Sequence, residues 1–213
     1  MKKLLLILLF LPMIGFGQVT MIPDANFEQK LIDLGYDSGT PNGSVYTALI
    51  DTVTNLDVSY SNIYDLTGIE DFTALTELNC AINQLTSLDV SNNLALTTLF
   101  CWNNQLISLD VSTNTALTNL YCYLNQLTSL DVSASTALTV LVCWYNQLTS
   151  LDVSTNTALT YFRCNSNQFT SLDVSANTAL ITLMCFNNQL TSLDVSNNTA
   201  LITLYCGSNQ LTS

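Results

Sequence analysis

The side chains best suited to chemistry in this sequence are seven cysteines and a series of aspartates, and both recur every 21 residues. A thiolate can act as a nucleophile or a metal ligand, and a carboxylate can bind a hard cation or transfer protons. The chain has no histidine, which excludes a Ser-His-Asp or Cys-His nucleophile and a histidine-ligated zinc. The cysteine series comprises Cys80, Cys101, Cys122, Cys143, Cys164, Cys185 and Cys206.

The position of the cysteines favours packing over chemistry. In Leu99-Phe100-Cys101-Trp102, strand alternation sends Leu99 and Cys101 inward, so each cysteine is expected at a buried strand position. Neighbouring parallel strands point their Cβ atoms side by side, which disfavours disulfides, and single stacked thiols do not form a tetrahedral metal cage. We therefore expect buried free thiols and no cofactor, with metal binding and a redox role as the alternatives.

The aspartates head segments that read Asp-Val-Ser. A hydrogen bond between each carboxylate and the backbone around the following serine would hold a turn, and Ca²⁺ shared between layers is the alternative. Carboxylate pairs such as Glu70 with Asp71 could in principle support glycosidase chemistry. No carboxylate pair departs from the repeat pattern, as a catalytic or metal-binding pair should. We therefore expect neither an enzyme nor a bound metal. The series comprises Asp89, Asp110, Asp131, Asp152, Asp173 and Asp194.

The charge balance excludes two classes of partner. The chain has 16 acidic and 4 basic residues and a net charge of −12. So few basic side chains cannot neutralise nucleic-acid phosphates or bind an anionic lipid surface electrostatically. We therefore expect no nucleic-acid partner.

The fold follows from the repeat. The consensus unit reads L-T-x-L-x-C-x-x-N-Q-L-T-S-L-D-V-S-x-N-T-A. Leucines at fixed offsets within such a period predict a leucine-rich-repeat solenoid, with a parallel β ladder on the concave face and a mostly non-helical convex side. Leu109-Asp110-Val111 also alternates, so a parallel β-helix is the alternative.

An asparagine follows each cysteine by three residues. It ends the strand, and its side-chain amide can satisfy backbone groups of the adjoining loop. We expect these residues to form a second structural ladder beside the cysteines. They are Asn83, Asn104, Asn125, Asn146, Asn167, Asn188 and Asn209.

The first residues form a targeting segment. Lys2 and Lys3 precede a short apolar run, and small residues follow, so residues 1–17 are predicted to be a signal peptide cleaved after Gly17. We expect a secreted or cell-surface protein without membrane insertion after cleavage.

Two further segments complete the expected organisation. Residues 18–74 are predicted to be an N-terminal cap, with a short helix that begins after Asp24 and turns Leu34 inward, followed by a degenerate repeat. Residues 75–213 hold the regular repeats. They stop inside a repeat, so we expect this chain to be truncated at its C-terminal side and the native protein to continue. We expect a monomer.

The positions that vary between repeats carry the functional signal. Residues directly before and after each cysteine are expected to face solvent on the strand side, and both tryptophans lie there. Contiguous exposed aromatic side chains mark binding surfaces, although strands also favour them for cross-strand packing. Arg163 borders this patch, where it could stack on a ring, pair with a ligand carboxylate or solubilise the face. The expected ligand-binding set is Phe100, Trp102, Tyr121, Tyr123, Trp144, Tyr145, Arg163, Met184, Phe186 and Tyr205.

The repeat resembles a known class. Residues 148–154, followed by Cys164 and Asn167, resemble the cysteine-ladder repeats of internalin J-like bacterial leucine-rich-repeat adhesins, and residues 22–28 and 66–70 resemble the N-terminal caps of exported relatives. The resemblance implies a secreted or surface binding protein. We expect a non-catalytic module that binds protein or glycan through the aromatic concave strand face. The alternative is a fragment of a larger adhesin or secreted enzyme in which the repeats are only a scaffold.

Overall fold

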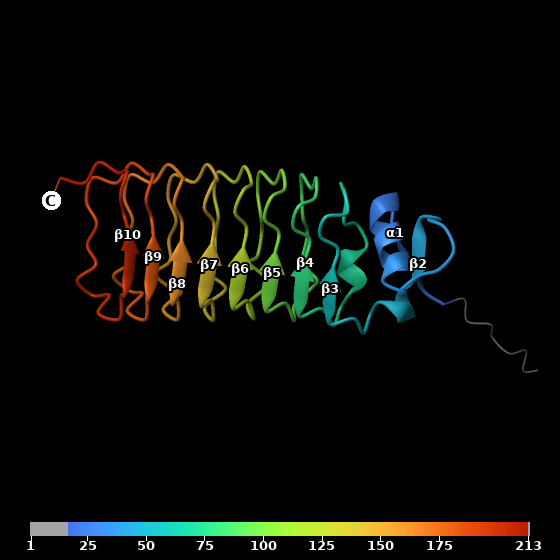
Figure 1. Ribbon diagram of the computed structural model, residues 1–213. Helices are drawn as coiled ribbons and strands as arrows, with labels where there is room; N and C mark the ends of the chain where they lie inside the picture. Colours follow the sequence, from blue (N-terminus) through green and yellow to red (C-terminus); the bar gives the residue numbers. More distant parts are fainter. Residues whose placement is uncertain (1–16, 213) are drawn as a thin grey trace, which may run out of the picture.

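The chain winds into a solenoid whose successive turns each add one short strand to a single parallel sheet (Figure 1). The computed structural model describes residues 17–212. The predicted signal peptide, apart from Gly17, lies outside the described residues. Within residues 17–212, no helix is long and apolar enough to cross a membrane.

The parallel sheet has eight strands, in the order β10-β9-β8-β7-β6-β5-β4-β3. Each strand pairs with the next in strict register, so that Leu99 lies opposite both Leu78 and Leu120. Every position of the repeat therefore stands directly beside its counterpart in the neighbouring layers. The strands are β3 (Asn55–Asp57), β4 (Glu77–Asn79), β5 (Thr98–Phe100), β6 (Asn119–Tyr121), β7 (Val140–Val142), β8 (Tyr161–Arg163), β9 (Thr182–Met184) and β10 (Thr203–Tyr205).

The segments that return from one strand to the next contain neither helix nor strand between β4 and β10. This confirms the leucine-rich-repeat prediction, and the β-helix alternative is wrong. Leu109-Asp110-Val111 alternates as a strand would, but the Asn114 N–H donates to the Val111 carbonyl at 3.0 Å and closes a turn there. The segment belongs to neither of the two sheets found in residues 17–212.

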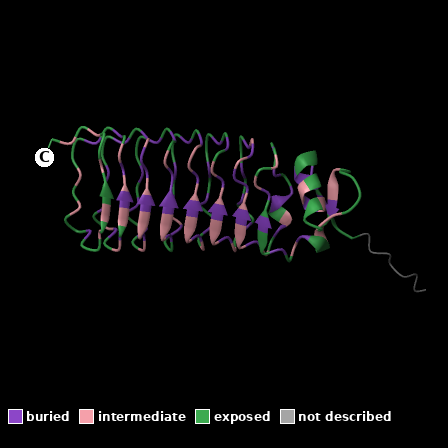
Figure 2. Ribbon diagram, viewed as in Figure 1, coloured by how far each residue is buried: buried purple, intermediate pink, exposed green. Residues whose placement is uncertain are grey.

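The buried hydrophobic residues form one continuous core along the solenoid, and Figure 2 shows buried segments recurring from turn to turn. Leu99, Cys101, Leu106 and Val111 show how one layer contributes to it, because all four are buried. A single layer cannot bury its apolar face alone, so the layers stabilise one another by stacking. In the last described turn Leu204 is 38% exposed.

The N-terminal elements stack on the first layer of the solenoid (Figure 1). Phe27 and Leu31 of the helix are buried, and the Phe27 ring stacks on Phe72 with centroids 6.3 Å apart. These contacts cover the apolar end of the column. The elements are β1 (Val19–Met21), α1 (Ala25–Asp33), β2 (Ser44–Tyr46), the 3-10 helix η1 (Thr47–Leu49) and the 3-10 helix η2 (Ile69–Asp71), with β1 and β2 antiparallel.

Asp24 caps α1 as the sequence predicts. Its Oδ1 accepts hydrogen bonds from the N–H groups of Asn26 and Phe27, and its Oδ2 accepts from those of Tyr64 and Asp65. One carboxylate thus both begins the helix and fastens it to the degenerate repeat.

The expected inward position of Leu34 is wrong. The helix ends at Asp33, Leu34 is its C-cap and the side chain is 41% exposed. The chain reverses at Gly35, whose φ of 82° suits glycine, so Leu34 leaves the helical face that Leu31 occupies.

Candidate functional site

The cysteine ladder is an apolar core element. All seven thiols are free, and six of them are buried, while Cys206 is half-buried. Burial raises the pKa of the Cys80 and Cys122 thiols to about 12. Thiols held in this protonated form are poor nucleophiles and poor metal ligands, as expected for packing residues.

The asparagine ladder ties each layer to the one before it. Asn125 Nδ2 donates to the carbonyls of Cys101 and Cys122 at 3.0 and 3.1 Å, and its Oδ1 accepts from the Leu106 N–H at 3.0 Å. The same bonds recur at the other positions of this ladder, as at Asn104. These side chains satisfy buried backbone groups at the end of each strand, which is the role the sequence predicts.

A second polar column crosses the interior on the return side, and sequence reasoning missed its role. Asn114 is completely buried and donates to the carbonyls of Val90 and Asn93, both at 3.0 Å. The sequence signal is the asparagine of the x-N-T-A segment, which is present at this position in every repeat except the one with Ser135. The column comprises Asn93, Asn114, Ser135, Asn156, Asn177 and Asn198.

The aspartate column lies exposed on the return side, and each carboxylate caps its own turn. Asp89 Oδ1 accepts from the Ser91 N–H at 2.9 Å, and Asp110 Oδ1 accepts from that of Ser112 at the same distance. Hydrogen bonds from the Ser91 side chain and N–H hold the pKa of Asp89 below its ordinary value. This is the turn-holding arrangement that the sequence favours over Ca²⁺.

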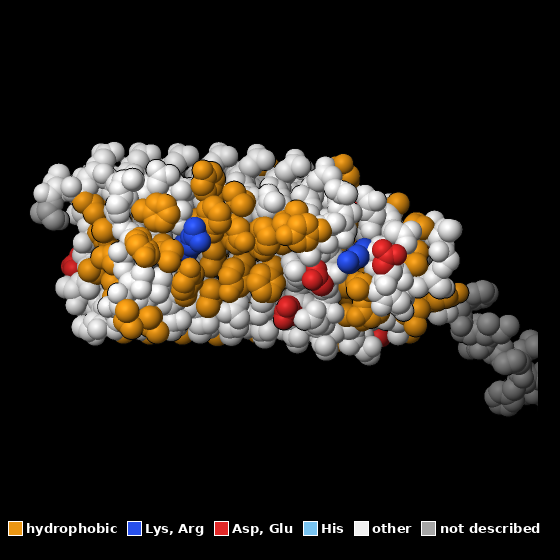
Figure 3. All heavy atoms as spheres, in the orientation of Figure 1, with side chains coloured by type: hydrophobic (Ala, Val, Ile, Leu, Met, Phe, Trp, Pro, Cys, Tyr) orange, Lys and Arg blue, Asp and Glu red, His pale blue; other side chains and the backbone are white. Residues whose placement is uncertain are grey.

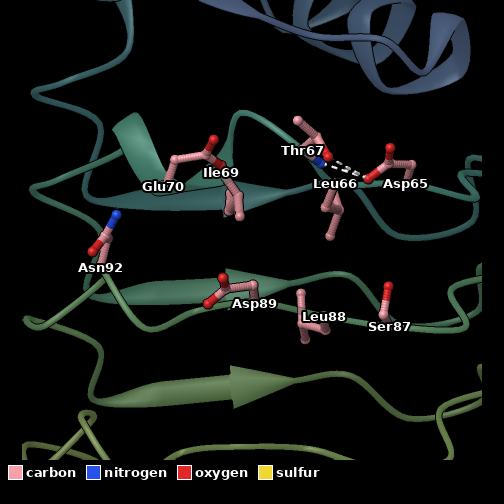
Figure 4. Close-up of a pocket in the computed structure, with 9 residues that line it drawn as sticks. All are labelled: Asp65, Leu66, Thr67, Ile69, Glu70, Ser87, Leu88, Asp89 and Asn92. Carbon is pink, nitrogen blue, oxygen red and sulfur yellow. Dashed lines mark hydrogen bonds between the residues drawn. The ribbon is translucent and has the colours of Figure 1, made fainter.

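A hollow of about 310 Å³ on the return side gathers three carboxylates between the degenerate repeat and the first regular one (Figure 4). Asp65 accepts from the Thr67 N–H and hydroxyl, and Glu70 accepts from the Gly68 N–H at 2.8 Å. Asp89 is the third. Each carboxylate is bonded within its own turn, and in residues 17–212 no group of three or more histidines, cysteines or acids is placed to hold a metal ion.

The candidate catalytic pair Glu70 and Asp71 is divided between two structural roles. Glu70 closes its own turn, whereas Asp71 Oδ2 accepts from the Thr20 hydroxyl at 2.6 Å and joins η2 to β1. Each of the two carboxylates therefore has its own structural hydrogen-bond partner.

The strand face is the outward surface of the parallel sheet, and it carries a column of stacked aromatic rings. The ring centroids of Trp102 and Tyr123 are 5.0 Å apart, and those of Tyr123 and Trp144 are 4.7 Å apart, with interplanar angles of 7° and 13°. Strict register produces this column, because one ring per layer repeats at the strand spacing. Hydrophobic side chains gather over the middle strands on this face (Figure 3).

Arg163 closes the column. Its guanidinium carbon lies 4.4 Å from the centroid of the Trp144 ring, and its Nε donates to Asn165 Oδ1 at 2.9 Å. Asn165 stands where the preceding layers have rings, so the arginine reaches across and fills that place. Of the uses proposed from sequence, stacking on a ring is the one observed.

A second, shorter stack runs beside the first. Phe100 and Tyr121 have centroids 4.7 Å apart. Tyr145 packs its edge against Trp144 at 5.5 Å and is 57% exposed. Burial raises the pKa of the Tyr121 hydroxyl. Two ring columns and an edge-packed tyrosine therefore make one continuous apolar patch.

The remaining predicted residues lie further along the sheet. Met184 places its sulfur 4.0 Å from the Tyr161 hydroxyl. Among residues 17–212, no stacked ring pair includes Phe186 or Tyr205. Seven of the ten predicted residues therefore lie in the layers of β5 to β8, whereas Met184 lies on β9, and Phe186 and Tyr205 stay outside the stacks.

A hollow of about 450 Å³ opens in the patch over β7. Val142 lies in it between the larger Tyr121 and Arg163 of the adjoining strands, and Val140 lies beside Tyr161 of β8. Sequence reasoning omitted Tyr161 and Val140, although period-2 alternation continued one residue pair further back would have placed both on this face. The other lining residues are Tyr121, Tyr123, Trp144, Tyr161 and Arg163.

The loop position that directly follows the Trp102–Tyr123–Trp144 column has left-handed backbone in every regular layer. Ile82, Leu124 and Tyr145 each have a φ of 54°, as does Asn103. This conformation disfavours most side chains, and β-branched ones above all, while asparagine tolerates it. The bulky side chains at this position therefore stand at a cost in backbone energy.

Together these features define a leucine-rich-repeat solenoid with a cysteine ladder. No family model matches the chain. The chain is similar to internalin J of Listeria monocytogenes serotype 4b (strain F2365), with 44% identity over 71 residues, which are 33% of this chain and 8% of internalin J.

Solved structures support the same placement. The functional domain of internalin J from Listeria monocytogenes, described as including a cysteine ladder, matches with a TM-score of 0.73 and 38% identity. The match covers 92% of this chain and 49% of that domain, so the chain spans about half of its length. Internalin C2 from the same species matches with a TM-score of 0.82 and 22% identity over 91% of this chain and 88% of its own, which shows the shared fold.

Proposed function

We propose that this chain is a non-catalytic, secreted or cell-surface recognition module that binds a partner protein through its aromatic strand face. The observation that carries the proposal is the ring column Trp102–Tyr123–Trp144, which is only half-buried on the parallel sheet. Aromatic residues supply much of the binding energy at protein interfaces and lose little conformational entropy there. The similarity to internalin J is consistent with this role.

The ring geometry favours protein over glycan. A sugar stacks on the flat face of a ring, but both faces of Tyr123 are covered by its neighbours. Trp144 has Tyr123 on one face and Arg163 on the other, so among these three rings only Trp102, at the end of the column, has a face without a ring or guanidinium over it. The column presents ring edges to solvent, and edges suit the mixed apolar and polar contacts of a protein surface.

The absence of a catalytic role is supported by the use of the carboxylates. Those of Asp65, Glu70 and Asp89 are bonded within their own turns, and Asp71 is bonded to β1. A general acid or base needs a carboxylate free to meet a substrate, in a geometry that distinguishes it from its neighbours.

The proposed location rests on residues 1–17 and on the class of relatives. A basic start, a short apolar run and small residues before Gln18 are typical of a secretory signal. Because the chain spans about half of the internalin J domain, a scaffold role within a larger surface protein is the competing proposal.

The test compares three proteins on arrays of secreted and surface proteins and of glycans. One is the unaltered chain, and one carries Trp102→Ala, Tyr123→Ala and Trp144→Ala. The matched control carries Ser108→Ala, Ser129→Ala and Ser150→Ala, three exposed positions in the same layers but off the strand face. Thermal unfolding checks that all three are folded.

We expect the unaltered chain and the serine control to bind the same protein and the aromatic variant to lose at least about tenfold in affinity. Binding to glycans alone would contradict the choice of partner class. Protein binding that the aromatic variant retains in full would move the site off the strand face. No binding by any of the three would favour the scaffold role.

A further inference from the structure

The hollow over β7 exists because two small side chains interrupt the aromatic patch. The position that holds Tyr121 in β6 and Arg163 in β8 holds Val142 in β7. Val142 is only 5% exposed, so it forms the base of the hollow, and the larger neighbours rise on either side. At about 450 Å³ the space falls in the range of sites that take one large side chain or a small ligand.

The hollow combines an apolar base with one basic group at its border. Arg163 is one of two basic residues within residues 17–212, and the other, Lys30, belongs to α1. The Asn165 amide takes the Nε–H, which is one of five guanidinium donors. Its terminal nitrogens can therefore donate to a carboxylate in the two-pronged geometry that arginine favours.

Stacking fixes that group in place. The guanidinium is held over Trp144 at 4.4 Å and tied to Asn165, so little side-chain entropy remains to be lost when it pairs. A partly desolvated guanidinium beside an apolar hollow attracts a carboxylate more strongly than an exposed one would.

We infer that the hollow is the anchor site of the strand face, and that it receives a large apolar side chain from a partner-protein loop whose adjoining aspartate or glutamate pairs with Arg163. The inference rests on the proposed function, because it names the chemistry by which the same face recognises its partner. Among residues 17–212 Arg163 is the one basic residue of the strand face, so in a chain of net charge −12 it marks the point where an acidic partner residue is favoured.

The test selects ligands from a display library of disulfide-closed random loops on the unaltered chain. Each selected loop is then measured by the emission of the two tryptophans, both of which lie on this face. Val142→Phe fills the hollow without removing any side chain of the patch, and Phe100 in the same column shows that a ring fits such a position. Thr182→Phe is the matched control, because it adds a ring to the strand face on β9, outside the hollow.

We expect the selected loops to pair a large apolar residue with a neighbouring aspartate or glutamate. Val142→Phe should lower the affinity for these loops at least about tenfold, and Arg163→Gln should lower it about tenfold. The affinity of Arg163→Lys should lie between those of Arg163→Gln and the unaltered chain, because lysine keeps the charge but not the two-pronged geometry. Thr182→Phe should change little. Replacing the acidic residue of a loop by its amide should not weaken its binding to the Arg163→Gln variant any further.

The failures of the two proposals can be told apart. Loops that lose binding in the Trp102, Tyr123 and Trp144 triple variant but bind Val142→Phe and Arg163→Gln normally would overturn the anchor and leave the proposed function standing. Loops that lack an acidic residue would overturn the carboxylate pairing. Selection of loops insensitive even to the triple variant would count against both proposals.

Discussion

The guanidinium carbon of Arg163 lies 4.4 Å from the centroid of the Trp144 ring, so a cation from one layer ends a column of rings contributed by the three preceding layers. The contact joins the two outward columns of the strand face, because Arg163 precedes its cysteine and Trp144 follows its own. The same contact therefore ends the ring column and positions the one charge of the patch.

Arg163→Gln should loosen this end of the column. A cation over an indole contributes about 0.5–1 kcal/mol at a partly exposed site, so the free energy of unfolding should fall by about that amount. Acrylamide quenching of tryptophan emission should rise, because one face of Trp144 becomes open. Lys30→Gln removes the basic charge of α1 and should leave quenching unchanged; equal quenching in the two variants would show that Arg163 does not cover the ring.

Asn125→Ala should destabilise the solenoid by about 3 kcal/mol. The change leaves the Leu106 N–H and the carbonyls of Cys101 and Cys122 buried without the amide that satisfies them. Chemical denaturation measures the loss. Gln126→Ala alters the exposed neighbour and should stay within about 0.5 kcal/mol, so similar effects at both positions would refute the role assigned to the ladder.

Ile82 and Asn103 occupy the same left-handed loop position in adjacent layers, and exchanging their side-chain types should move stability in opposite directions. Ile82→Asn should raise the free energy of unfolding by about 1 kcal/mol, and Asn103→Ile should lower it by about as much. Both backbone N–H groups keep their bonds to the next layer. Thermal and chemical unfolding of the two variants check the signs, and a loss in both would contradict the backbone explanation.

The buried thiols should make the protein sensitive to alkali. In the fold the pKa of Cys80 and Cys122 is about 12, against an ordinary value of 9.0. Their contribution is complete below pH 9 and is lost as the pH rises towards 12, because the unfolded chain releases these protons first. Between pH 9 and pH 12, each of these two thiols should lower the free energy of unfolding by about 1.4 kcal/mol per pH unit.

The free energy of unfolding, measured at several pH values in this window, gives the slope. The double variant Cys80→Val, Cys122→Val should have a slope that is smaller by the contribution of two thiols. This difference separates the effect of the cysteines from that of the tyrosines. An unchanged slope would mean that these thiols are not protected in the fold.

Much of this architecture could be predicted because every repeat shows the same pattern of buried and polar residues. Alternation around Leu99 and Cys101 gave the inward positions, and the spacing of Asn104 from Cys101 indicated a strand-ending amide. The interior role of Asn114 was missed because a polar residue on the return side looks like an ordinary turn residue until stacking buries it. Arg163 can reach Trp144 because Asn165, and not a ring, follows Cys164. This relationship between two columns cannot be recognised from either column alone.

The hollow could not be predicted for a related reason. Val140 and Val142 are unremarkable strand residues one by one, and a depression arises only because their partners on β8, Tyr161 and Arg163, are larger. Left-handed backbone at Leu124 and Tyr145 likewise follows from the geometry of the loop, which every layer shares, and not from those side chains, which disfavour it.

Acrylamide quenching of tryptophan emission with and without a saturating bound partner tests the central claim most directly, because both tryptophans of the chain lie in the ring column. The measurement is made in Trp102→Phe and Trp144→Phe variants, so that each tryptophan reports alone while a ring is kept in the stack. If the strand face is the recognition surface, the partner should lower the quenching constant in both variants. Saturable binding of the partner with unchanged quenching in both would place recognition elsewhere on the solenoid.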